Sequence, residues 1–272
     1  MKEPKVELKK KPWAIDKTRV KVLSPGTGAT VPPAGPVEMH YYGVNGRTGK
    51  KFDDSFSRGQ TATFALDRVV PGFQKGLAGQ KAGSRVLVAM PGEDGYDKQG
   101  GSQQAGIEVG DSLIFVIDIV ATTLEQPEGD KQKVAADLPT VSDDLKNPKI
   151  TVPTTDPPTE LKSATVIKGK GAKVAATDAV TVNYRGVLWS GGTVIDENYG
   201  SKTGPETAAP TELIAGFGEG LADQTVGSRV LIVIPPDKAY GPDGNEAMKI
   251  PADATLVYVV DILFTQPTQA PQ

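Results

Sequence analysis

Polar and apolar side chains alternate strictly in two separated segments of the chain. Over residues 37–42, the odd positions are Val, Met and Tyr and the even positions are Glu, His and Tyr. The same order returns over residues 180–185, where Val, Val and Tyr alternate with Thr, Asn and Arg. Because successive side chains of a strand point to opposite faces, this period of two predicts half-buried strands. Tyr41 and Tyr184 should then lie on the apolar faces.

A longer period predicts one helix in the same part of the chain. Phe73, Gly76 and Leu77 recur at i, i+3 and i+4, which predicts a helix of about two turns over residues 73–80 despite two glycines. Residues 19–23, 85–90 and 113–119 are rich in β-branched residues and predict further strands. Many strands with one short helix predict an α+β fold, an antiparallel sheet curled around the helix.

This set of elements occurs twice along the chain. Residues 72–91 recur as residues 216–235, an offset of 216 − 72 = 144 positions. Residues 37–44 and 112–119 recur as residues 180–187 and 255–262, at an offset of 143. The period far exceeds the roughly 20–50 residues of solenoid repeats. Three blocks that keep their order and spacing therefore predict a duplicated domain, and a length of 272 residues agrees with two domains.

The composition between the repeated blocks divides the chain further. Residues 1–17 are rich in Lys and are expected to form an extended N-terminal arm. The two domains are expected at residues 18–124 and 161–265. Residues 125–160 contain several prolines and few large apolar residues, and we expect a semi-rigid linker there. Residues 266–272 are expected to be a disordered tail.

Composition excludes several kinds of chemistry. There is no cysteine, so disulfides, thiolate catalysis and Cys-ligated metals are excluded, and the single His40 argues against a His-based metal site or catalytic triad. The net charge of −3, with scattered Lys and Arg, gives no indication of nucleic-acid binding. No apolar run approaches the ~18 residues that span a membrane. We expect no metal and no cofactor.

Short blocks in both copies resemble the FKBP-type peptidyl-prolyl cis-trans isomerases. In the first copy these are Val22-Leu-Ser-Pro-Gly-Thr-Gly28, His40-Tyr-Tyr-Gly43, Lys50-Lys-Phe-Asp53, Val69-Val-Pro-Gly-Phe73, Gly83-Ser-Arg85 and Leu113-Ile-Phe-Val116. In the second they are Asn183-Tyr-Arg-Gly186, Val194-Ile-Asp196, Leu213-Ile-Ala-Gly-Phe217, Ala239-Tyr-Gly241, Ile250-Pro251 and Ala254-Thr-Leu-Val-Tyr258. The resemblance implies a twisted half-barrel sheet wrapped around one short helix, with an aromatic pocket between them.

The resemblance also implies the residues of each pocket. Those implied to act on the substrate amide are Asp53, Tyr96, Phe115, Asp196 and Tyr240. Those implied to bind the substrate are Tyr41, Phe52, Phe64, Val69, Val70, Phe73 and Ile107 in the first copy, and Tyr184, Ile195, Leu213, Ile214, Phe217, Ile250 and Tyr258 in the second. Without the resemblance, the inward aromatics would be ordinary core residues, the two aspartates turn residues and His40 a surface residue.

The implied reaction breaks no covalent bond. Resonance gives the peptide bond a rotation barrier of ~18–20 kcal/mol, and X-Pro bonds isomerise slowly enough to limit folding. A dry aromatic pocket should favour the twisted, less polar amide over the planar one, which is differential stabilisation of the transition state. Phe73 and Phe217 would form the floor under the proline ring, where the family usually has Trp. The amides of Val70 and Ile214 would donate to the substrate carbonyl.

The two copies depart from the family pattern in different places. The first has Gly95-Tyr96-Asp97 where the family has Ala-Tyr-Gly, so the loop over its pocket should differ. The second has Ile195 in place of the usual Phe. Its residues 205–210, with two prolines and a Glu, stand where the first copy has an aromatic strand that contains Phe64. These substitutions argue against a dry wall and a central strand there. We predict that the first copy is the more competent isomerase.

Three functions remain open at this point. They are a prolyl isomerase acting on proteins, a chaperone whose two tethered pockets hold one client, and a non-catalytic interaction module on the same scaffold. The expected partners are proline-containing unfolded or folding polypeptides and macrolides of the FK506 or rapamycin type, and the chain is expected to be a monomer without nucleic-acid partners. The tandem arrangement, the linker and the Lys-rich arm favour an exported protein of the bacterial cell envelope with its leader upstream of Met1; the alternative is the cytoplasm.

Overall fold

The computed structural model describes residues 2–202 and 204–267. Contacts within the chain divide it between Thr123 and Leu124 into two compact units, which we call domain 1 and domain 2. Each has its own buried core, as expected for a duplication. Among the described residues, no helix is long and apolar enough to cross a membrane.

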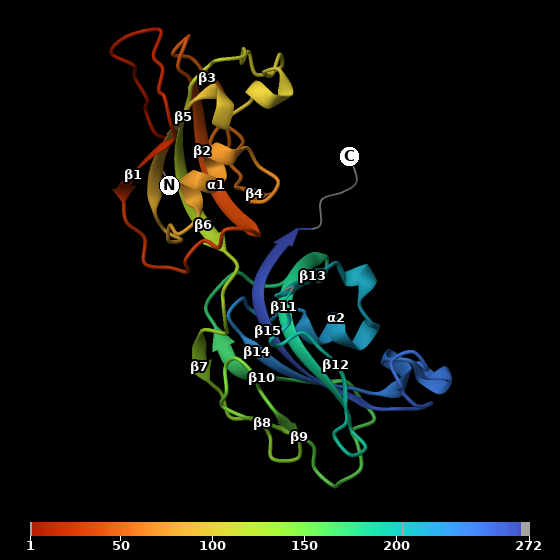
Figure 1. Ribbon diagram of the computed structural model, residues 1–272. Helices are drawn as coiled ribbons and strands as arrows, with labels where there is room; N and C mark the ends of the chain where they lie inside the picture. Colours follow the sequence, from red (N-terminus) through yellow and green to blue (C-terminus); the bar gives the residue numbers. More distant parts are fainter. Residues whose placement is uncertain (1, 203, 268–272) are drawn as a thin grey trace. The chain divides into compact units, whose positions relative to one another are not determined.

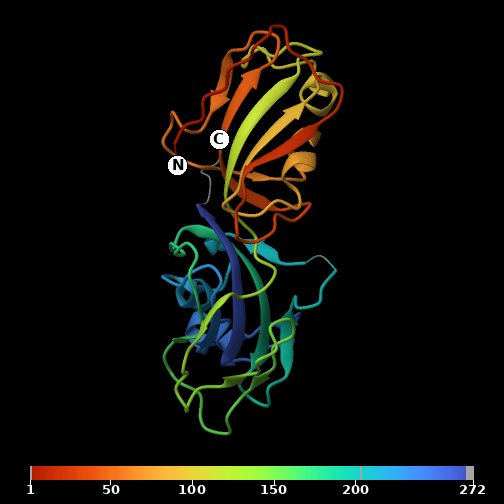
Figure 2. The same cartoon turned by 90° about the vertical axis from the view of Figure 1, so that its left-hand side faces the viewer.

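Domain 1 is a twisted antiparallel sheet with one short α-helix against it (Figure 1). The strand order is β1-β5-β6-β2-β3, and β4 pairs with β2 outside this path. Figure 2 shows the twist, with the yellow-green β6 between its neighbours. The elements are β1 (Arg19–Ser24), β2 (Pro36–Asn45), β3 (Lys51–Asp54), β4 (Ala62–Ala65), α1 (Pro71–Leu77), β5 (Arg85–Met90), the 3-10 helices η1 (Gly92–Asp94) and η2 (Asp97–Gln99), and β6 (Leu113–Thr122).

The glycines of helix α1 explain how so short a helix packs on the sheet. A Cβ on Gly76 would stand 2.7 Å from Cγ2 of Val88 on β5, and a Cβ on Gly72 would stand 2.4 Å from Sδ of Met90. Glycine at these positions lets the helix backbone approach the strand closely, which outweighs its low helix propensity. Leu77, which is fully buried, completes the contact. The α+β fold predicted from the sequence is confirmed.

Domain 2 repeats this arrangement with added strands. Its sheet has the order β12-β11-β15-β14-β10-β7, and β13 pairs with β11 outside this path. The elements are β7 (Gly129–Lys131), β8 (Thr140–Val141), β9 (Ile150–Thr151), β10 (Lys162–Gly169), β11 (Asp178–Leu188), β12 (Val194–Glu197), β13 (Glu206–Ala208), η3 (Pro210–Glu212), α2 (Ala215–Leu221), β14 (Arg229–Ile234), η4 (Pro236–Lys238), η5 (Gly241–Asp243) and β15 (Leu256–Pro267). The short β13 occupies the segment whose prolines argued against a central strand.

Residues 125–160, expected to be a linker, are packed against domain 2, and we call them the strap. Strand β7 pairs with β10, and β8 pairs with β9 in a separate hairpin. Val134, Leu138, Val141, Ile150 and Val152 of the strap cover an apolar cluster on the sheet that includes Leu231 and Val233. The reason is that β14 is buried along its whole length, so both of its faces need a cover.

The N-terminal arm of domain 1 corresponds to the last part of the strap. Pro4-Lys5-Val6 recurs as Pro148-Lys149-Ile150, at the 144-residue offset of the main repeat. Nη2 of Arg85 donates to the carbonyl of Lys2 at 2.7 Å, and Nη2 of Arg229 donates to that of Leu145 at 3.0 Å. The repeated unit therefore begins upstream of the first strand in both copies.

The two ends of the described chain differ in structure. Residues 2–17 of the arm hold no helix or strand, and Trp13 N–H donates to the carbonyl of Gly46 at 3.0 Å. Strand β15 continues to Pro267, so the first two residues of the expected tail belong to the sheet. Residues 268–272 lie outside the described residues.

Candidate active site

Aromatic side chains from five elements of domain 1 meet between helix α1 and the sheet. The ring of Phe73 on α1 lies 4.6 Å from that of Phe115 on β6, centroid to centroid, and Phe52 on β3 lies 5.5 Å from Phe115. Tyr41 on β2 meets Phe64 on β4 edge to face at 5.8 Å. Phe115 is buried, whereas Phe52, Phe64 and Phe73 remain partly exposed. The rings therefore form one cluster in which three of them reach solvent, and we call this aromatic cluster the first hollow.

All the apolar pocket residues implied for the first copy belong to this one cluster. They are Tyr41, Phe52, Phe64, Val69, Val70, Phe73, Tyr96, Ile107 and Phe115. Gly43 on β2 makes room for two of the rings, because a Cβ there would stand 2.7 Å from Cζ of Phe52 and 2.9 Å from Cε1 of Phe115. The roles of these residues in binding or turnover stay predictions.

A hydrogen-bonded triad stands at one edge of the first hollow. The hydroxyl of Tyr41 donates to Oδ2 of Asp53 at 2.6 Å. Arg58 donates from Nη1 to Oδ1 of Asp53 at 2.9 Å and from Nη2 to the Tyr41 hydroxyl at 2.7 Å. Burial and the bond to Asp53 raise the pKa of Tyr41 to about 12, so its hydroxyl keeps its proton. The sequence analysis missed Arg58, which lies in a turn without any periodic pattern; its place five residues after Asp53 was the available signal.

Two further predicted groups border the same hollow. Burial, with the charge of Asp53, raises the pKa of Tyr96, so its half-buried hydroxyl remains a donor. Val70 caps helix α1, and within the described part of the chain its backbone N–H has no hydrogen-bond partner. Both groups could donate to a polar atom placed above the rings.

The corresponding hollow of domain 2 has the same framework with fewer large rings. Phe217 on α2 and Tyr258 on β15 meet edge to face at 5.2 Å, and Tyr184 on β11 lies 6.2 Å from Phe217. Phe217 is only 5% exposed. The implied residues of this copy again share one cluster: Tyr184, Ile195, Leu213, Ile214, Phe217, Tyr240, Ile250 and Tyr258.

The polar edge of the second hollow differs from that of the first. The hydroxyl of Tyr184 donates to Oδ2 of Asp196 at 2.9 Å, and Oε2 of Glu206 lies 3.4 Å from the same hydroxyl. Burial, then Asp196 and then Glu206 raise the pKa of Tyr184. The hydroxyl of Tyr240 donates to Sδ of Met248 at 3.3 Å, a weak acceptor that a stronger one can displace. Neither Glu206 nor Met248 was singled out from the sequence.

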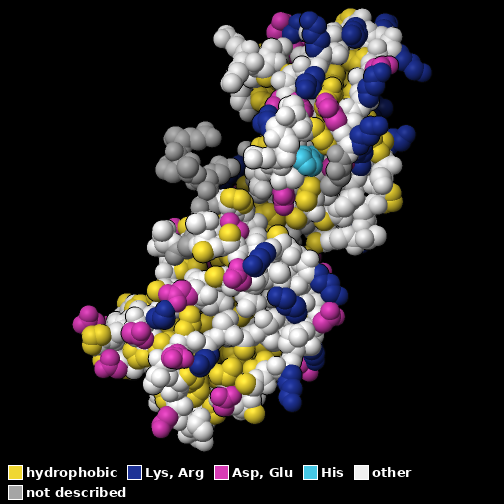
Figure 3. All heavy atoms as spheres, turned by 180° about the vertical axis from the view of Figure 1, so that it is seen from behind, with side chains coloured by type: hydrophobic (Ala, Val, Ile, Leu, Met, Phe, Trp, Pro, Cys, Tyr) yellow, Lys and Arg dark blue, Asp and Glu magenta, His cyan; other side chains and the backbone are white. Residues whose placement is uncertain are grey.

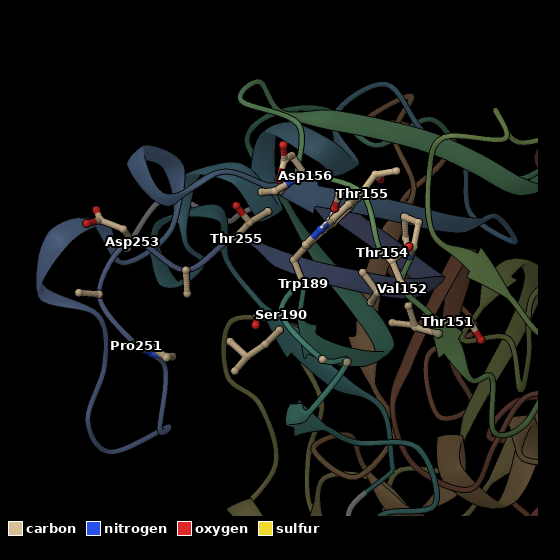
Figure 4. Close-up of a pocket in the computed structure, with 18 residues that line it drawn as sticks. Thr151, Val152, Thr154, Thr155, Asp156, Trp189, Ser190, Pro251, Asp253 and Thr255 are labelled. Carbon is tan, nitrogen blue, oxygen red and sulfur yellow. Dashed lines mark hydrogen bonds between the residues drawn. The ribbon is translucent and has the colours of Figure 1, made fainter.

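A separate cavity of about 930 Å³ lies in domain 2 between the strap and the turn after β11 (Figure 4). Nε1 of Trp189 donates across it to the carbonyl of Thr155 at 3.0 Å. At the matching positions, domain 1 has Asn45, Arg47 and Asp111, which are joined by hydrogen bonds of 2.7–3.0 Å. Domain 2 has Leu188, Ser190 and Ala254 there, whose side chains are too short or too apolar to form this hydrogen-bond network. This cavity lies outside the predicted sites.

Charge is distributed unequally between the two domains. Residues 1–123 hold 17 Lys and Arg against 13 Asp and Glu, and residues 124–272 hold 13 against 20. On the face shown in Figure 3, basic side chains gather over domain 1 and acidic ones over domain 2. Among the described residues, no group of three or more His, Asp or Glu side chains could hold a metal ion.

Both copies of the repeat are similar to known proteins. The family model described as FKBP-type peptidyl-prolyl cis-trans isomerase matches residues 28–120 and 170–263. A probable FK506-binding protein of Corynebacterium glutamicum is 36% identical over 121 residues, 44% of this chain and 99% of that protein. The rat peptidyl-prolyl cis-trans isomerase FKBP9 is 25% identical over 238 residues, 86% of this chain and 35% of that protein. The solved structure of the three FKBP domains of wheat FKBP73 is 20% identical, covers 92% of this chain and 95% of its own, and has a TM-score of 0.38.

The chain matches only part of the length of several relatives. It spans 40% of a probable FKBP-type isomerase of Haemophilus influenzae and 39% of FkpA of Aeromonas hydrophila. The family match itself falls on both copies and leaves residues 1–27, 121–169 and 264–272 unmatched. The chain therefore belongs to the FKBP-type peptidyl-prolyl cis-trans isomerase family and carries the domain of that family twice.

Proposed function

We propose that this protein isomerises X-Pro bonds in unfolded or folding polypeptides, and that domain 1 supplies most of the activity. The observation that carries the proposal is the partly exposed Phe73, walled by Phe52, Tyr41 and Phe115. A proline ring placed on Phe73 is removed from water. The planar X-Pro amide is then less stabilised by solvation, so rotation about the amide bond becomes easier. No bond is broken, so positioning groups suffice.

The difference between the domains rests on ring exposure and wall composition. Phe217 is 5% exposed, whereas Phe73 is partly exposed, so the second floor offers less surface to a ligand. Ile195 stands where domain 1 has Phe52, and Ala208 pairs with Val180 as Phe64 pairs with Val37. Two aromatic walls of the first hollow are therefore aliphatic in the second.

The test is a protease-coupled isomerisation assay on the full chain with a proline tetrapeptide. Phe73→Ala should remove most of the catalysed rate, and Phe217→Ala should remove the smaller part. Circular dichroism of both variants controls for folding, since Phe73 is at the surface of its cluster. A full rate in Phe73→Ala, or a larger loss in Phe217→Ala, contradicts the assignment.

The two pockets also favour a second candidate, a chaperone that holds clients with two proline sites. Two tethered sites raise the effective concentration of the second site once the first is occupied. Suppression of client aggregation that survives the combined loss of Phe73 and Phe217 would locate the holding surface elsewhere. We further propose a monomer that acts outside the cytoplasm and binds FK506-type macrolides in domain 1.

A further inference from the structure

The polar edges of the two hollows differ in two charged groups, Arg58 in domain 1 and Glu206 in domain 2. In domain 1, the Tyr41 hydroxyl donates its proton to Asp53 and accepts a hydrogen bond from Arg58, which also bonds Asp53. A tyrosine hydroxyl has one proton to donate and lone pairs to accept with. Both capacities are used in this triad, and the carboxylate charge is balanced by the guanidinium.

In domain 2, the acidic partner is doubled and the basic one is absent. The Tyr184 hydroxyl can donate to Asp196 or to Glu206, but not fully to both, because it has one proton. Within residues 2–202 and 204–267, no lysine or arginine makes an ion pair with either carboxylate. The edge therefore holds two acceptor groups of like charge with no cationic donor between them.

The register of the sheet explains why domain 2 has an acidic side chain at this edge. Glu206 on β13 pairs with Val182, as Ala62 on β4 pairs with Met39 in domain 1. The acidic side chain thus stands on the inner margin of the cleft, where the first copy has a methyl group. Glu206 is exposed to solvent, so a ligand can reach it without rearrangement of the core.

Three cations of domain 2 come into question as a counterpart of Arg58. Lys202, six residues after Asp196, is exposed and makes no ion pair with Asp196 or Glu206 among the described residues. Arg185 bonds Glu197, the side chain of Asn147 and the carbonyl of Pro148. Lys238 bonds Glu219 beside helix α2. Neither Arg185 nor Lys238 is available to take the place that Arg58 has in domain 1.

We propose that the second cleft selects proline segments with a lysine or arginine beside the proline, whose cationic group lies between Asp196 and Glu206. This inference rests on the proposed function, because it assumes that the hollow receives a proline ring. A neighbouring residue is at most about 3.6 Å further along the chain, so a long basic side chain reaches the edge of the hollow from there. Its ammonium or guanidinium supplies the missing donors to both carboxylates. Domain 1, already neutralised by Arg58, lacks this preference.

The test measures binding to each domain separately in the full chain, by the chemical shifts of labelled backbone amides. The probes are acetyl-Ala-Lys-Pro-Phe-amide and acetyl-Ala-Glu-Pro-Phe-amide, whose capped ends carry no charge. Amides of Gly186 and Ile214 report on domain 2, and those of Gly43 and Val70 on domain 1. Because binding is read instead of turnover, a failure here is distinct from a failure of the isomerase proposal.

In the wild type, domain 2 should bind the Lys peptide about three- to tenfold more tightly than the Glu peptide, since exposed ion pairs are individually weak and one peptide is attracted while the other is repelled. Domain 1 should differ by less than about twofold between the two peptides. High salt should reduce the preference of domain 2 by screening.

Three variants decide whether Glu206 is responsible. Glu206→Gln should remove most of the preference, and Glu206→Arg, which restores the charge that Arg58 gives domain 1, should abolish or invert it. The matched control is Glu160→Gln, the same change at an exposed glutamate that pairs with Lys162; it should leave the preference unchanged. Equal affinities for the two peptides in domain 2, an equal effect of Glu160→Gln, or no binding of either peptide to domain 2 would each overturn the proposal.

Discussion

Replacing Arg229 by Ala is expected to destabilise domain 2 far more than the matched change at Arg85 destabilises domain 1. Arg229 is 1% exposed and donates to both oxygens of Asp261, at 2.7 and 2.9 Å, and to the carbonyls of Asp144 and Leu145 in the strap. Its removal leaves a carboxylate that is 1% exposed without its cation. Breaking a buried pair in this way costs about 3–5 kcal/mol.

In the corresponding pair of domain 1 the arginine is more exposed, whereas its partner Asp118 is also buried. The side chain of Arg85 is 27% exposed, and it bonds Asp118 and the carbonyl of Lys2. Water can replace part of what Arg85 provides, so its loss should cost about 1–3 kcal/mol. For a domain of this size, each kcal/mol lowers the midpoint of thermal unfolding by about 2–4 °C. Arg229→Ala should therefore lower the transition of domain 2 by about 6–20 °C.

The assay is scanning calorimetry of the full chain, with hydrogen exchange of the β7 amides to detect release of the strap. Burial raises the pKa of Asp261 even with Arg229 present. Without Arg229 the folded-state pKa rises further above the unfolded value, so the loss of stability should grow as the pH rises and be smaller near about pH 5 than near about pH 8. Arg229→Leu combined with Asp261→Leu should recover much of the loss. A shift below about 3 °C, or one no larger than that of Arg85→Ala, would refute this reasoning.

Two further changes test the first hollow and its support. Gly43→Ala should lower the isomerase rate severalfold in the protease-coupled assay, because the new Cβ would stand 2.7 Å from Phe52 and force that ring across the cleft; an unaltered rate would show that the rings yield without consequence. Burial alone would raise the pKa of Asp111, but bonds from Arg47, the Glu108 amide and Asn45 together lower it. The stabilising contribution of Asp111 is thus present above its ordinary pKa of about 3.9 and is lost as the pH falls through the lowered pKa. The difference in unfolding midpoint between wild type and Asp111→Asn should therefore shrink in acid. A difference that stays constant with pH would argue against this role.

The rings of the hollows could be predicted from the sequence because strict alternation fixes the face of a strand. Tyr41 and Tyr184 point inward, as the period of two required, and the repeat placed Phe73 and Phe217 on equivalent helices. The glycines of helix α1, which counted against a helix, reflect its contact with β5, a constraint that only the packed structure contains.

The polar edge and the strap could not be predicted in the same way. The position of Arg58 depends on a turn and that of Glu206 on the register of β13, and a single sequence has no periodic pattern that predicts either. The strap has few apolar residues of its own, and its position follows from the sheet it covers. The apolar run Val230 to Ile234 of β14 would need cover on both faces, but the matching β5 has a similar run, Val86 to Met90, so this run alone did not distinguish the two copies.

The central claim is that aromatic hollows floored by Phe73 and Phe217 speed rotation about X-Pro bonds. The most direct test is the cis–trans exchange rate of a proline peptide, measured by NMR with catalytic amounts of the intact chain and of the variant Phe73→Ala/Phe217→Ala. The account predicts fast exchange with the intact chain and an exchange rate near that of the free peptide with the folded double variant. Equal acceleration by both proteins, or none by the intact chain, would contradict it.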